Sequence, residues 1–250
     1  MSTTKESFKP KSNTPPIGFF NSIRFYIRLC LDLQTISAYR HLKDFLQNTN
    51  GQLLDVGCGG SPYRFLINEN STRYFGLDIV DADEKFNYNR KDIYSFDGNK
   101  IPFSENHFDF LICTEVLEHV ENYQSLVDEI YRVLKSNGKA LITIPWSARF
   151  HYIPYDYFRY TPTTLLKMFS HFKDIEIIPR GTDVTSIAAK LIVLFVRNIL
   201  PNNLLRYLFI PFWLIASPIV IIGMILGHIS LLTRFGNDSD PLGYTILVKK

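Results

Sequence analysis

Apolar positions along the middle of this chain follow two alternating patterns. Short apolar runs, typical of buried strands, are separated by stretches whose apolar side chains recur every three or four positions, typical of helices. The strand-like runs are Leu53–Val56, Tyr74–Ile79, Phe86–Ile93, Phe108–Cys113, Lys139–Pro145, Asp174–Pro179 and Tyr244–Lys250. The helix-like stretches are one that begins at Ser61-Pro62, Tyr123–Leu134 and Thr161–Phe172. This alternation predicts an α/β fold with a mostly parallel sheet, doubly wound by helices.

Two segments precede this α/β region. Residues 1–16 are polar, contain proline and lack the apolar run of a signal peptide, so we expect a disordered cytoplasmic tail. In residues 17–48 basic side chains such as Arg24 and Arg28 are interleaved with apolar ones such as Ile23 at helical spacing. A helix here would cover the active site, contact a membrane or pack on the core. The sequence leaves these three alternatives open.

Composition narrows the classes of function. The 250 residues carry a formal net charge of +3, which is too small to indicate nucleic-acid binding. Aromatic residues make up 14% of the chain, a mild sign of contact with membrane interfaces. The cysteines Cys30, Cys58 and Cys113 show no paired spacing, which suits a reducing compartment. We therefore expect no nucleic-acid partner, and the oligomeric state is not indicated.

A glycine-rich loop follows the first predicted strand. After Asp55, the glycines Gly57 and Gly59 allow a tight turn and close approach of a ligand to the backbone. Ser61-Pro62 would then begin a helix whose N-terminus attracts an anion. The dinucleotide fingerprint G-x-G-x-x-G fails, because Pro62 stands at its last position. A pyrophosphate is therefore disfavoured, and the carboxylate of an amino-acid-like cofactor stays open.

Two carboxylates farther along the chain would complete a nucleotide-type site. Asp78 ends the second predicted strand, and an acceptor-only carboxylate at this place can take both hydroxyls of a ribose. Asp92 follows the third predicted strand and could accept from an adenine amino group. The structural alternatives are a solvated aspartate at a strand end for Asp78 and a turn cap for Asp92.

The stretch from Ile101 to Val120 carries a resemblance to a known family. Its sequence, Ile-Pro-Phe-Ser-Glu-Asn-His-Phe-Asp-Phe-Leu-Ile-Cys-Thr-Glu-Val-Leu-Glu-His-Val, closely resembles the signature of class I S-adenosylmethionine-dependent methyltransferases related to the ubiquinone and menaquinone biosynthesis enzymes. The resemblance covers Gln52–Ile178 and the terminal strand. It implies a Rossmann-like, doubly wound seven-stranded sheet whose last strand is antiparallel and lies beside the sixth. It also implies S-adenosyl-L-methionine as the cofactor.

The same resemblance implies roles for individual residues. Gly57 and Gly59 would line the methionine part of the cofactor, and Thr114 would lie beside its sulfonium. Asp78 would hold the ribose, and Asp92 with Ile93 would flank the adenine. The cofactor-binding residues predicted in this way are Asp55, Gly57, Gly59, Asp78, Asp92, Ile93 and Thr114.

One candidate group for the chemistry lies within this signature. A hydroxyl acceptor needs its proton removed, usually by His, Asp or Glu. Glu115, Glu118 and His119 have an E-x-x-E-H spacing that resembles a magnesium site in some members of the family. Many relatives carry Leu-Glu-His here without a metal, so we predict no metal. His119 would be a catalytic residue, or alternatively a structural hydrogen-bonding one.

A second candidate group follows the fifth predicted strand, where loops build ligand sites in doubly wound sheets. Here His151 would be the base, Asp156 its orienting carboxylate and Arg159 an anion-binding guanidinium. Tyr155 and Tyr160 would contact the substrate. The string resembles methyltransferases of bacterial cell-surface polysaccharide clusters. The alternative is a lid whose polar residues only pair with one another.

An apolar insertion separates the last two strands, so the chain divides into four parts. These are a tail (1–16), an N-terminal helical segment (17–48), a methyltransferase core (49–182 and 237–250) and the insertion (183–236). Within it Tyr207–Gly227 carries no charged residue and is long enough to span a bilayer. The insertion begins and ends at strands that are neighbours in one sheet, so both of its ends lie on the same side of a membrane and a single full crossing of the bilayer is excluded. Pro211 and Pro218 therefore predict a broken, re-entrant or kinked hairpin; the alternative is a soluble cap or dimer interface.

Together these features predict a methyltransferase on the cytoplasmic face of a membrane, monotopic or re-entrant, that contacts the membrane through residues 187–232. The acceptor would be a small or lipid-linked molecule, preferably a hydroxyl of a lipid-linked or cell-surface glycan precursor. One alternative is a quinone or isoprenoid O- or C-methyltransferase. Another is a non-catalytic membrane scaffold with the same fold, which the intact Gly57, Gly59 and Asp78 disfavour.

Overall fold

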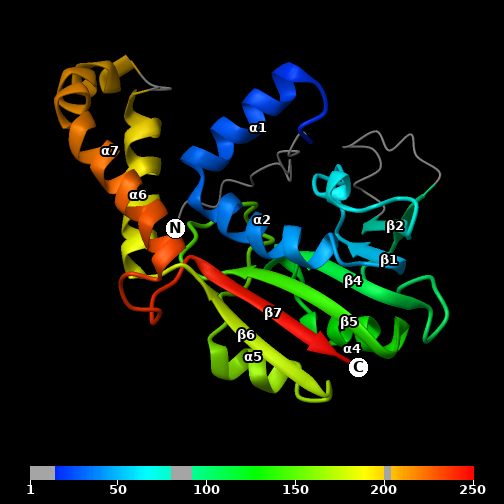
Figure 1. Cartoon of the computed structure of the whole chain (residues 1–250). Helices are drawn as coiled ribbons and strands as arrows, with labels where there is room; N and C mark the ends of the chain where they lie inside the picture. Colours follow the sequence, from blue (N-terminus) through cyan, green and yellow to red (C-terminus); the bar gives the residue numbers. More distant parts are fainter. Residues whose placement is uncertain (1–14, 80–91, 200–203) are drawn as a thin grey trace.

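The computed structural model describes residues 15–79, 92–199 and 204–250, with side chains described from residue 207 in the last range. The predicted tail at 1–16 therefore falls almost wholly outside the described residues, and so does most of the third strand expected at Phe86–Ile93. The described residues form a sheet with helices on both faces, and the N-terminal helices pack on one of them (Figure 1).

One seven-stranded sheet, in the order β3-β2-β1-β4-β5-β7-β6, accounts for the strands of the described residues. Its strands are β1 (Gly51–Val56), β2 (Thr72–Ile79), β3 (Ile93–Phe96), β4 (Phe108–Thr114), β5 (Leu134–Pro145), β6 (Asp174–Arg180) and β7 (Gly243–Lys249). The first five run parallel, while β7 is antiparallel to both β5 and β6. The expected Rossmann-like sheet, with an antiparallel last strand beside the sixth, is confirmed.

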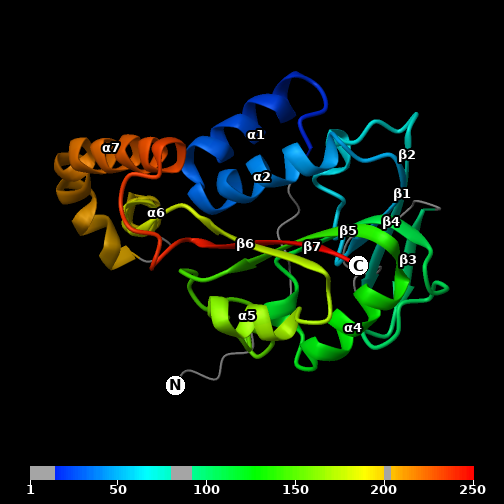
Figure 2. The same ribbon diagram turned by 60° about the horizontal axis from the view of Figure 1, so that its bottom comes forward.

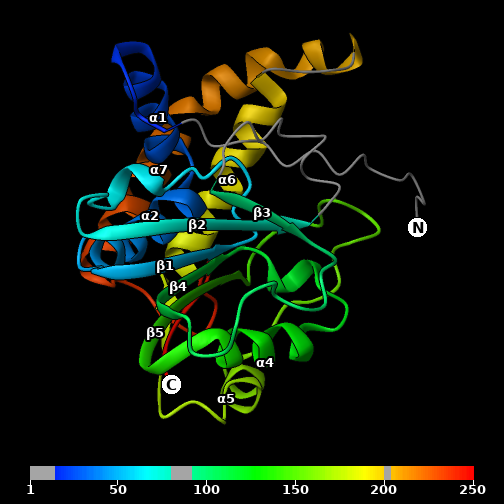
Figure 3. The same ribbon diagram turned by 90° about the vertical axis from the view of Figure 1, so that its right-hand side faces the viewer.

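Helices cover the two faces of this sheet. The described α-helices are α1 (Phe19–Leu31), α2 (Leu33–Leu46), α4 (Tyr123–Val133), α5 (Pro162–Met168), α6 (Asp183–Ile199) and α7 (Ile210–Thr233). Figure 2 and Figure 3 show α4 and α5 on one face, with α1, α2, α6 and α7 on the other. Leu126 and Ile130 of α4 pack into the larger core, and Leu42 of α2 packs into the smaller one on the opposite face.

Local sequence signals explain two of the helix boundaries. Asp32 separates α1 from α2, because its side chain accepts a hydrogen bond from the backbone N–H of Thr35 at 3.1 Å and so caps α2. Thr161 caps α5 in the same way by accepting from the N–H of Thr164, and Pro162 fills the first turn. The helix start predicted at Thr161 is therefore confirmed.

The insertion between β6 and β7 is a helical hairpin in which α6 leads away from the sheet and α7 returns to it (Figure 1). Pro211 lies in the first turn of α7, but Pro218 lies inside one continuous helix, so the predicted break at Pro218 is wrong. A proline leaves the carbonyl four residues earlier without its usual N–H donor. The hydroxyl of Ser217 donates to that carbonyl, on Leu214, at 2.7 Å.

Candidate functional site

The loop after β1 is built for close approach of a ligand. Gly57 has φ of 69° and Gly59 has φ of 48°, a region that favours glycine. A Cβ on Gly57 would overlap the side chain of Val116, so this position is also closed sterically. A Cβ on Gly59 would meet nothing within 4 Å. The loop therefore leaves open space beside Gly59.

Asp78 meets this loop from the neighbouring strand. The N–H of Gly59 donates to Oδ2 of Asp78 at 2.8 Å, and Oδ1 accepts from the N–H of Ile79 at 2.8 Å. β1 and β2 are parallel neighbours, so their carboxyl ends reach the same edge of the sheet. A carboxylate offers about four acceptor positions, so Asp78 retains the capacity to accept from ligand hydroxyls. The glycine loop and Asp78 thus form one site.

The helix expected at Ser61-Pro62 does not form. Ser61 has φ of 53°, which is unsuited to a helix N-cap, and it is buried with its hydroxyl hydrogen-bonded to that of Tyr74 at 2.9 Å. The chain instead makes a short 3-10 turn, η1 (Arg64–Leu66). The prediction that a helix N-terminus holds an anion here is therefore wrong.

A cavity of about 550 Å³ lies at this edge of the sheet, within the usual range for small-molecule sites of about 300–1,000 Å³. Of the residues predicted from the sequence, it is lined by Gly57, Gly59, Asp78, Thr114, His119, His151 and Tyr155. Other lining residues were not predicted from the sequence as part of the site: Arg28, Gln34, Thr35, Ile79, Phe96, Gly98, Thr143 and Arg180. The cavity therefore joins the predicted cofactor residues to both candidate histidines.

Asp55 does not line this cavity but lies buried beneath the loop. The hydroxyl of Tyr74 donates to its Oδ2 at 2.7 Å. Burial raises the pKa of Asp55 to about 7, despite the opposing effect of the Tyr74 hydrogen bond. With a pKa of about 7, a large fraction of this carboxyl is protonated at neutral pH. In the structure Asp55 supports the loop from below.

This raised pKa predicts a pH-dependent stability. The native state favours the neutral carboxyl, so its contribution is complete below the unfolded pKa of about 3.9 and is lost as the pH rises through about 7. Asp55→Asn removes the titration while keeping an acceptor for Tyr74. Between pH 5 and pH 8 the wild type should lose about 2–3 kcal/mol of unfolding free energy relative to this variant. Urea unfolding at several pH values measures this, and parallel pH profiles would contradict it.

The third strand corrects the predicted adenine contact. A contact from Asp92 and Ile93 requires the third strand to end there, but β3 begins at Ile93. Asp92 forms an ion pair with Arg64, and both line a different cavity. Asp97 follows the observed strand, and its Oδ1 caps the turn by accepting from the N–H of Asn99 at 2.9 Å. Its neighbours Phe96 and Gly98 line the cavity beside Gly59 and Asp78, whereas Asp92 and Ile93 do not.

His119 lines the cavity in a defined tautomer. Its Nδ1 lies 2.7 Å from the carbonyl oxygen of Tyr155. Because a carbonyl can only accept, Nδ1 carries the proton and Nε2 is the basic nitrogen. Burial lowers the pKa of His119, and the bond to Tyr155 opposes this incompletely. His119 is therefore held as a neutral imidazole, the form that accepts a proton.

The loop after β5 contains a buried ion pair. Asp156, whose side chain is 1% exposed, accepts from both terminal nitrogens of Arg159 at 2.6 and 2.9 Å. Burial alone would raise the pKa of Asp156, but the bonds from Arg159 and from the backbone N–H of His151 lower it. Arg159 also donates to two backbone carbonyls and does not line the cavity. Asp156 Oδ2 also lies 3.4 Å from Nδ1 of His151, so the predicted contact between these two side chains is present. Arg159, by contrast, matches the alternative of a residue paired within the loop.

The two tyrosines predicted to contact substrate differ in position. Tyr155 lines the cavity and is 49% exposed. Tyr160 is buried in the core, where its hydroxyl donates to the carbonyl of Leu117 at 2.9 Å, so its predicted substrate contact is wrong. The tyrosine pattern alone could not separate these positions, because both side chains have an apolar ring and a polar tip.

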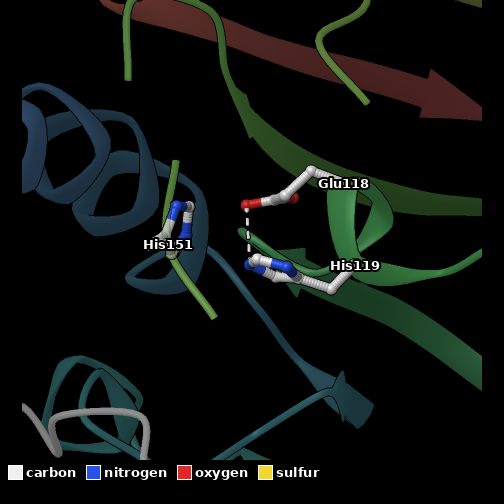
Figure 4. A group of neighbouring side chains, drawn as sticks. All are labelled: Glu118, His119 and His151. Carbon is white, nitrogen blue, oxygen red and sulfur yellow. Dashed lines mark ion pairs between the residues drawn. The ribbon is translucent and has the colours of Figure 1, made fainter. Parts of the chain in front are cut away.

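Glu118, His119 and His151 converge across the two candidate groups (Figure 4). Their ligand atoms lie within 4.8 Å of one another, so the three could hold a divalent cation. Burial and the nearby Glu115 raise the pKa of Glu118, whose oxygens accept no hydrogen bond from the described residues. Glu115 instead accepts from Arg180 at 2.7 Å, outside this group. The absence of a metal stays a prediction.

The residues present fit an adenosyl amino-acid cofactor. The glycine loop opens toward the cavity beside Gly59, and the carboxylate of Asp78 lies next to it. Thr143 and Gln34 line the same cavity, and Thr143 Oγ1 and Gln34 Oε1 are buried without a hydrogen-bond partner among the described residues. Phe96 adds an aromatic wall. A ligand with hydroxyls, an amino-acid group and a flat apolar ring would satisfy these features together.

Comparisons with known proteins agree with this geometry. Residues 54–142 match the family described as a methyltransferase domain. An ubiquinone biosynthesis O-methyltransferase of Rickettsia conorii is 30% identical over 107 residues, covering 37% of this chain and 34% of the relative. A demethylmenaquinone methyltransferase of a Geobacillus species is 30% identical over 156 residues, covering 54% of this chain and 67% of the relative. The alignments thus span from 34% to 67% of these relatives' own lengths.

Solved structures share the fold at low identity. The crystal structure of a SAM-dependent methyltransferase from Archaeoglobus fulgidus superimposes with a TM-score of 0.55 at 18% identity. The match covers 88% of this chain and 95% of that one. This similarity is a similarity of fold and says nothing about the acceptor.

Proposed function

Because this chain belongs to the class I S-adenosylmethionine-dependent methyltransferases, we propose that it transfers a methyl group to a hydroxyl of a lipid-linked or cell-surface glycan precursor at a membrane. The observation that carries the transfer is the cavity that joins the loop of Gly57 and Gly59, the carboxylate of Asp78 and the imidazole of His119. The predicted donor site and the predicted base thus border the same cavity.

In this proposal the donor half of the cavity binds S-adenosylmethionine. The cofactor supplies a methyl group already activated on a sulfonium. Gly57 and Gly59 accommodate its methionine part, and Asp78 accepts hydrogen bonds from its ribose hydroxyls. Thr114, at the carboxyl end of β4, lies where the acceptor half begins. Transfer then depends mainly on alignment, with reacting atoms held about 3–3.5 Å apart.

The acceptor half supplies the base. His119 is neutral, its Nδ1–H is fixed on Tyr155, and Nε2 takes the proton of the acceptor hydroxyl. His151 borders the same space, its ring centroid 4.7 Å from that of His119. Asp156 holds the backbone of His151 through a bond of 3.0 Å. His151 and Tyr155 thereby shape the acceptor position.

The apolar hairpin supports a membrane location. Tyr207–Thr233 is long and apolar enough to cross a membrane by length and composition, with a mean hydropathy of 2.4, and 6% of its most apolar window is buried. β6 and β7 pair directly, so both ends of the hairpin emerge on one side. This topology supports a monotopic or re-entrant contact, which we propose lies on the cytoplasmic face of the membrane. An amphipathic acceptor is the kind of substrate that such a location presents.

A quinone or isoprenoid acceptor is the second candidate. It is favoured by the curated relatives, whose names refer to ubiquinone and menaquinone synthesis. A purely structural scaffold is disfavoured by the open space beside Gly59 and the contact of this glycine with Asp78.

Labelled cofactor distinguishes these candidates. The full chain is incubated with methyl-labelled S-adenosylmethionine and membrane lipids, which are then separated. We expect label in a saccharide-bearing lipid fraction, whereas label in a quinone fraction would support the second candidate. His119→Ala should slow transfer about 100-fold, in the range of a lost general base, with unchanged cofactor affinity. Absence of cofactor binding by the wild type would contradict an enzymatic role.

A further inference from the structure

Helix α1 presents an apolar stripe to solvent on the side away from the core. Phe25 and Leu29 are buried and attach the helix. Phe20 is 78% exposed and Ile27 is 55% exposed. The remaining large exposed apolar side chains of α1 are Phe19, Ile23, Tyr26 and Leu31. These positions recur every three or four residues and so share one side of the helix.

Helix α7 presents a second apolar surface. Its large apolar side chains stand in solvent along most of the helix, for example Phe212, Ile215, Ile219, Ile222 and Ile225. The Nε2–H of His228 in α7 donates to the carbonyl of Cys30 at the end of α1, at 2.8 Å. Arg40 of α2 donates to the carbonyl of Leu231 at 3.0 Å. These contacts hold α1 and α7 on the same side of the sheet (Figure 2).

Charge on these segments is of one sign. Residues 17–31 and 187–234 contain no Asp or Glu. The basic residues Arg24, Lys190, Arg197 and Arg234 are exposed. An apolar surface bordered by cations matches an anionic headgroup layer. A two-fold contact with a second copy would bring these like charges together, which is unfavourable.

The position of Arg197 also fixes how the hairpin meets the lipid. Arg197 lies near the end of α6 that is remote from the sheet, whereas Arg234 follows α7 beside the sheet. Inserting the tip into hydrocarbon would bury the guanidinium of Arg197, which is costly. A hairpin that lies along the interface keeps both cations at the headgroups.

Helix α1 also borders the cavity. Arg28 lines the cavity, while Ile27 and Leu31 beside it in α1 belong to the exposed stripe. The same helix therefore has one side at the reaction space and another at the apolar surface. A lipid-anchored acceptor held at that surface would have its polar head next to Arg28.

We propose that α1 and α7 form one docking surface that lies in the plane of an anionic bilayer and places the cavity at the headgroups. This inference rests on the proposed function and adds α1, which lies outside the 187–232 segment, to the membrane contact. Of the three roles that the sequence left open for this helix, which were covering the active site, contacting a membrane and packing on the core, the proposal selects the membrane contact.

Vesicle binding by the full chain tests the surface. The variant Phe20→Ser/Ile27→Ser is compared with Leu166→Ser, whose 52% exposed leucine lies in α5 on the opposite face. On vesicles of phosphatidylglycerol and phosphatidylcholine, we expect at least about tenfold weaker binding for the α1 variant. Leu166→Ser should bind as the wild type does. All three should bind pure phosphatidylcholine more weakly than the mixture.

Three outcomes would overturn the inference. These are unchanged vesicle binding by the α1 variant, equal binding to both vesicle types, and a dimer in solution that the α1 substitutions convert to a monomer. Calorimetry with S-adenosylmethionine separates this test from the proposed function. The α1 variant should retain wild-type cofactor affinity, whereas a wild type that binds vesicles but no cofactor would contradict the proposed function alone.

Discussion

Replacing Asp78 by Ala should weaken the binding of S-adenosylmethionine about 100-fold. The carboxylate adjoins the glycine loop through its bond to the Gly59 N–H and lines the cavity. Hydrogen bonds to a charged group contribute about 1.5–3 kcal/mol each, so losing those to two ribose hydroxyls costs about 3 kcal/mol or more. A factor of ten in affinity corresponds to about 1.4 kcal/mol. Isothermal titration calorimetry measures the change directly.

The matched control for this experiment is Asp92→Ala. Asp92 was the second carboxylate predicted to contact the cofactor, but it pairs with Arg64 beside another cavity. Its removal should leave cofactor affinity within about twofold of the wild type, a change of under about 0.5 kcal/mol. Equal losses in the two variants, or a loss confined to Asp92→Ala, would mean that the ligand occupies the other cavity.

Replacing Asp156 by Ala should lower the free energy of unfolding by about 3–5 kcal/mol. This is the usual cost of removing one partner of a buried ion pair, because the other charge is left uncompensated. The side chain of Arg159 is 17% exposed, and in this variant it loses its hydrogen bonds of 2.6 and 2.9 Å to Asp156. The backbone N–H of His151 loses its acceptor as well. Urea unfolding of both proteins at pH 7 measures the difference.

The double variant Asp156→Ala/Arg159→Met is the control for this effect. It removes both charges and keeps an apolar side chain of similar length, so most of the lost stability should return. A similar loss in the single and the double variant would show that packing rather than charge is responsible. An unchanged midpoint for Asp156→Ala would contradict the burial of this pair.

The fold could be predicted largely from local patterns. The central parallel strands contain buried runs, as in Leu53–Val56 of β1, because both faces of the sheet are covered there. The third strand could not be placed in this way, because β3 is short and only its last residue, Phe96, is buried. Because of this misplacement, the residues after the third strand were taken to be Asp92 and Ile93, whereas Phe96 and Gly98 are the ones that line the cavity.

The glycine loop was predicted correctly as a close-approach turn, but its continuation was not. Ser61 and Pro62 are favourable residues for a helix start, and a sequence pattern cannot reveal that Tyr74 engages the hydroxyl of Ser61 from the next strand. The same limit applies to Pro218, whose effect on α7 is offset by Ser217. Tertiary contacts override local preference at both places.

The acceptor half of the site was harder to predict than the donor half. His119 and His151 are brought together from segments that follow different strands, which topology alone suggests. Arg28 and Arg180 reach the same cavity from α1 and from the end of β6. Neither has a sequence signal, because a lone arginine at helical spacing or after a strand is common on any surface.

The central claim is that the cavity beside Gly59 and Asp78 holds S-adenosylmethionine. A crystal structure of the chain with S-adenosylhomocysteine tests it most directly. We predict the ribose hydroxyls within hydrogen-bond distance of the Asp78 carboxylate, about 2.5–3.0 Å between oxygens, and the sulfur directed toward His119. Density for the ligand in the cavity lined by Arg64 and Asp92 instead would contradict the claim.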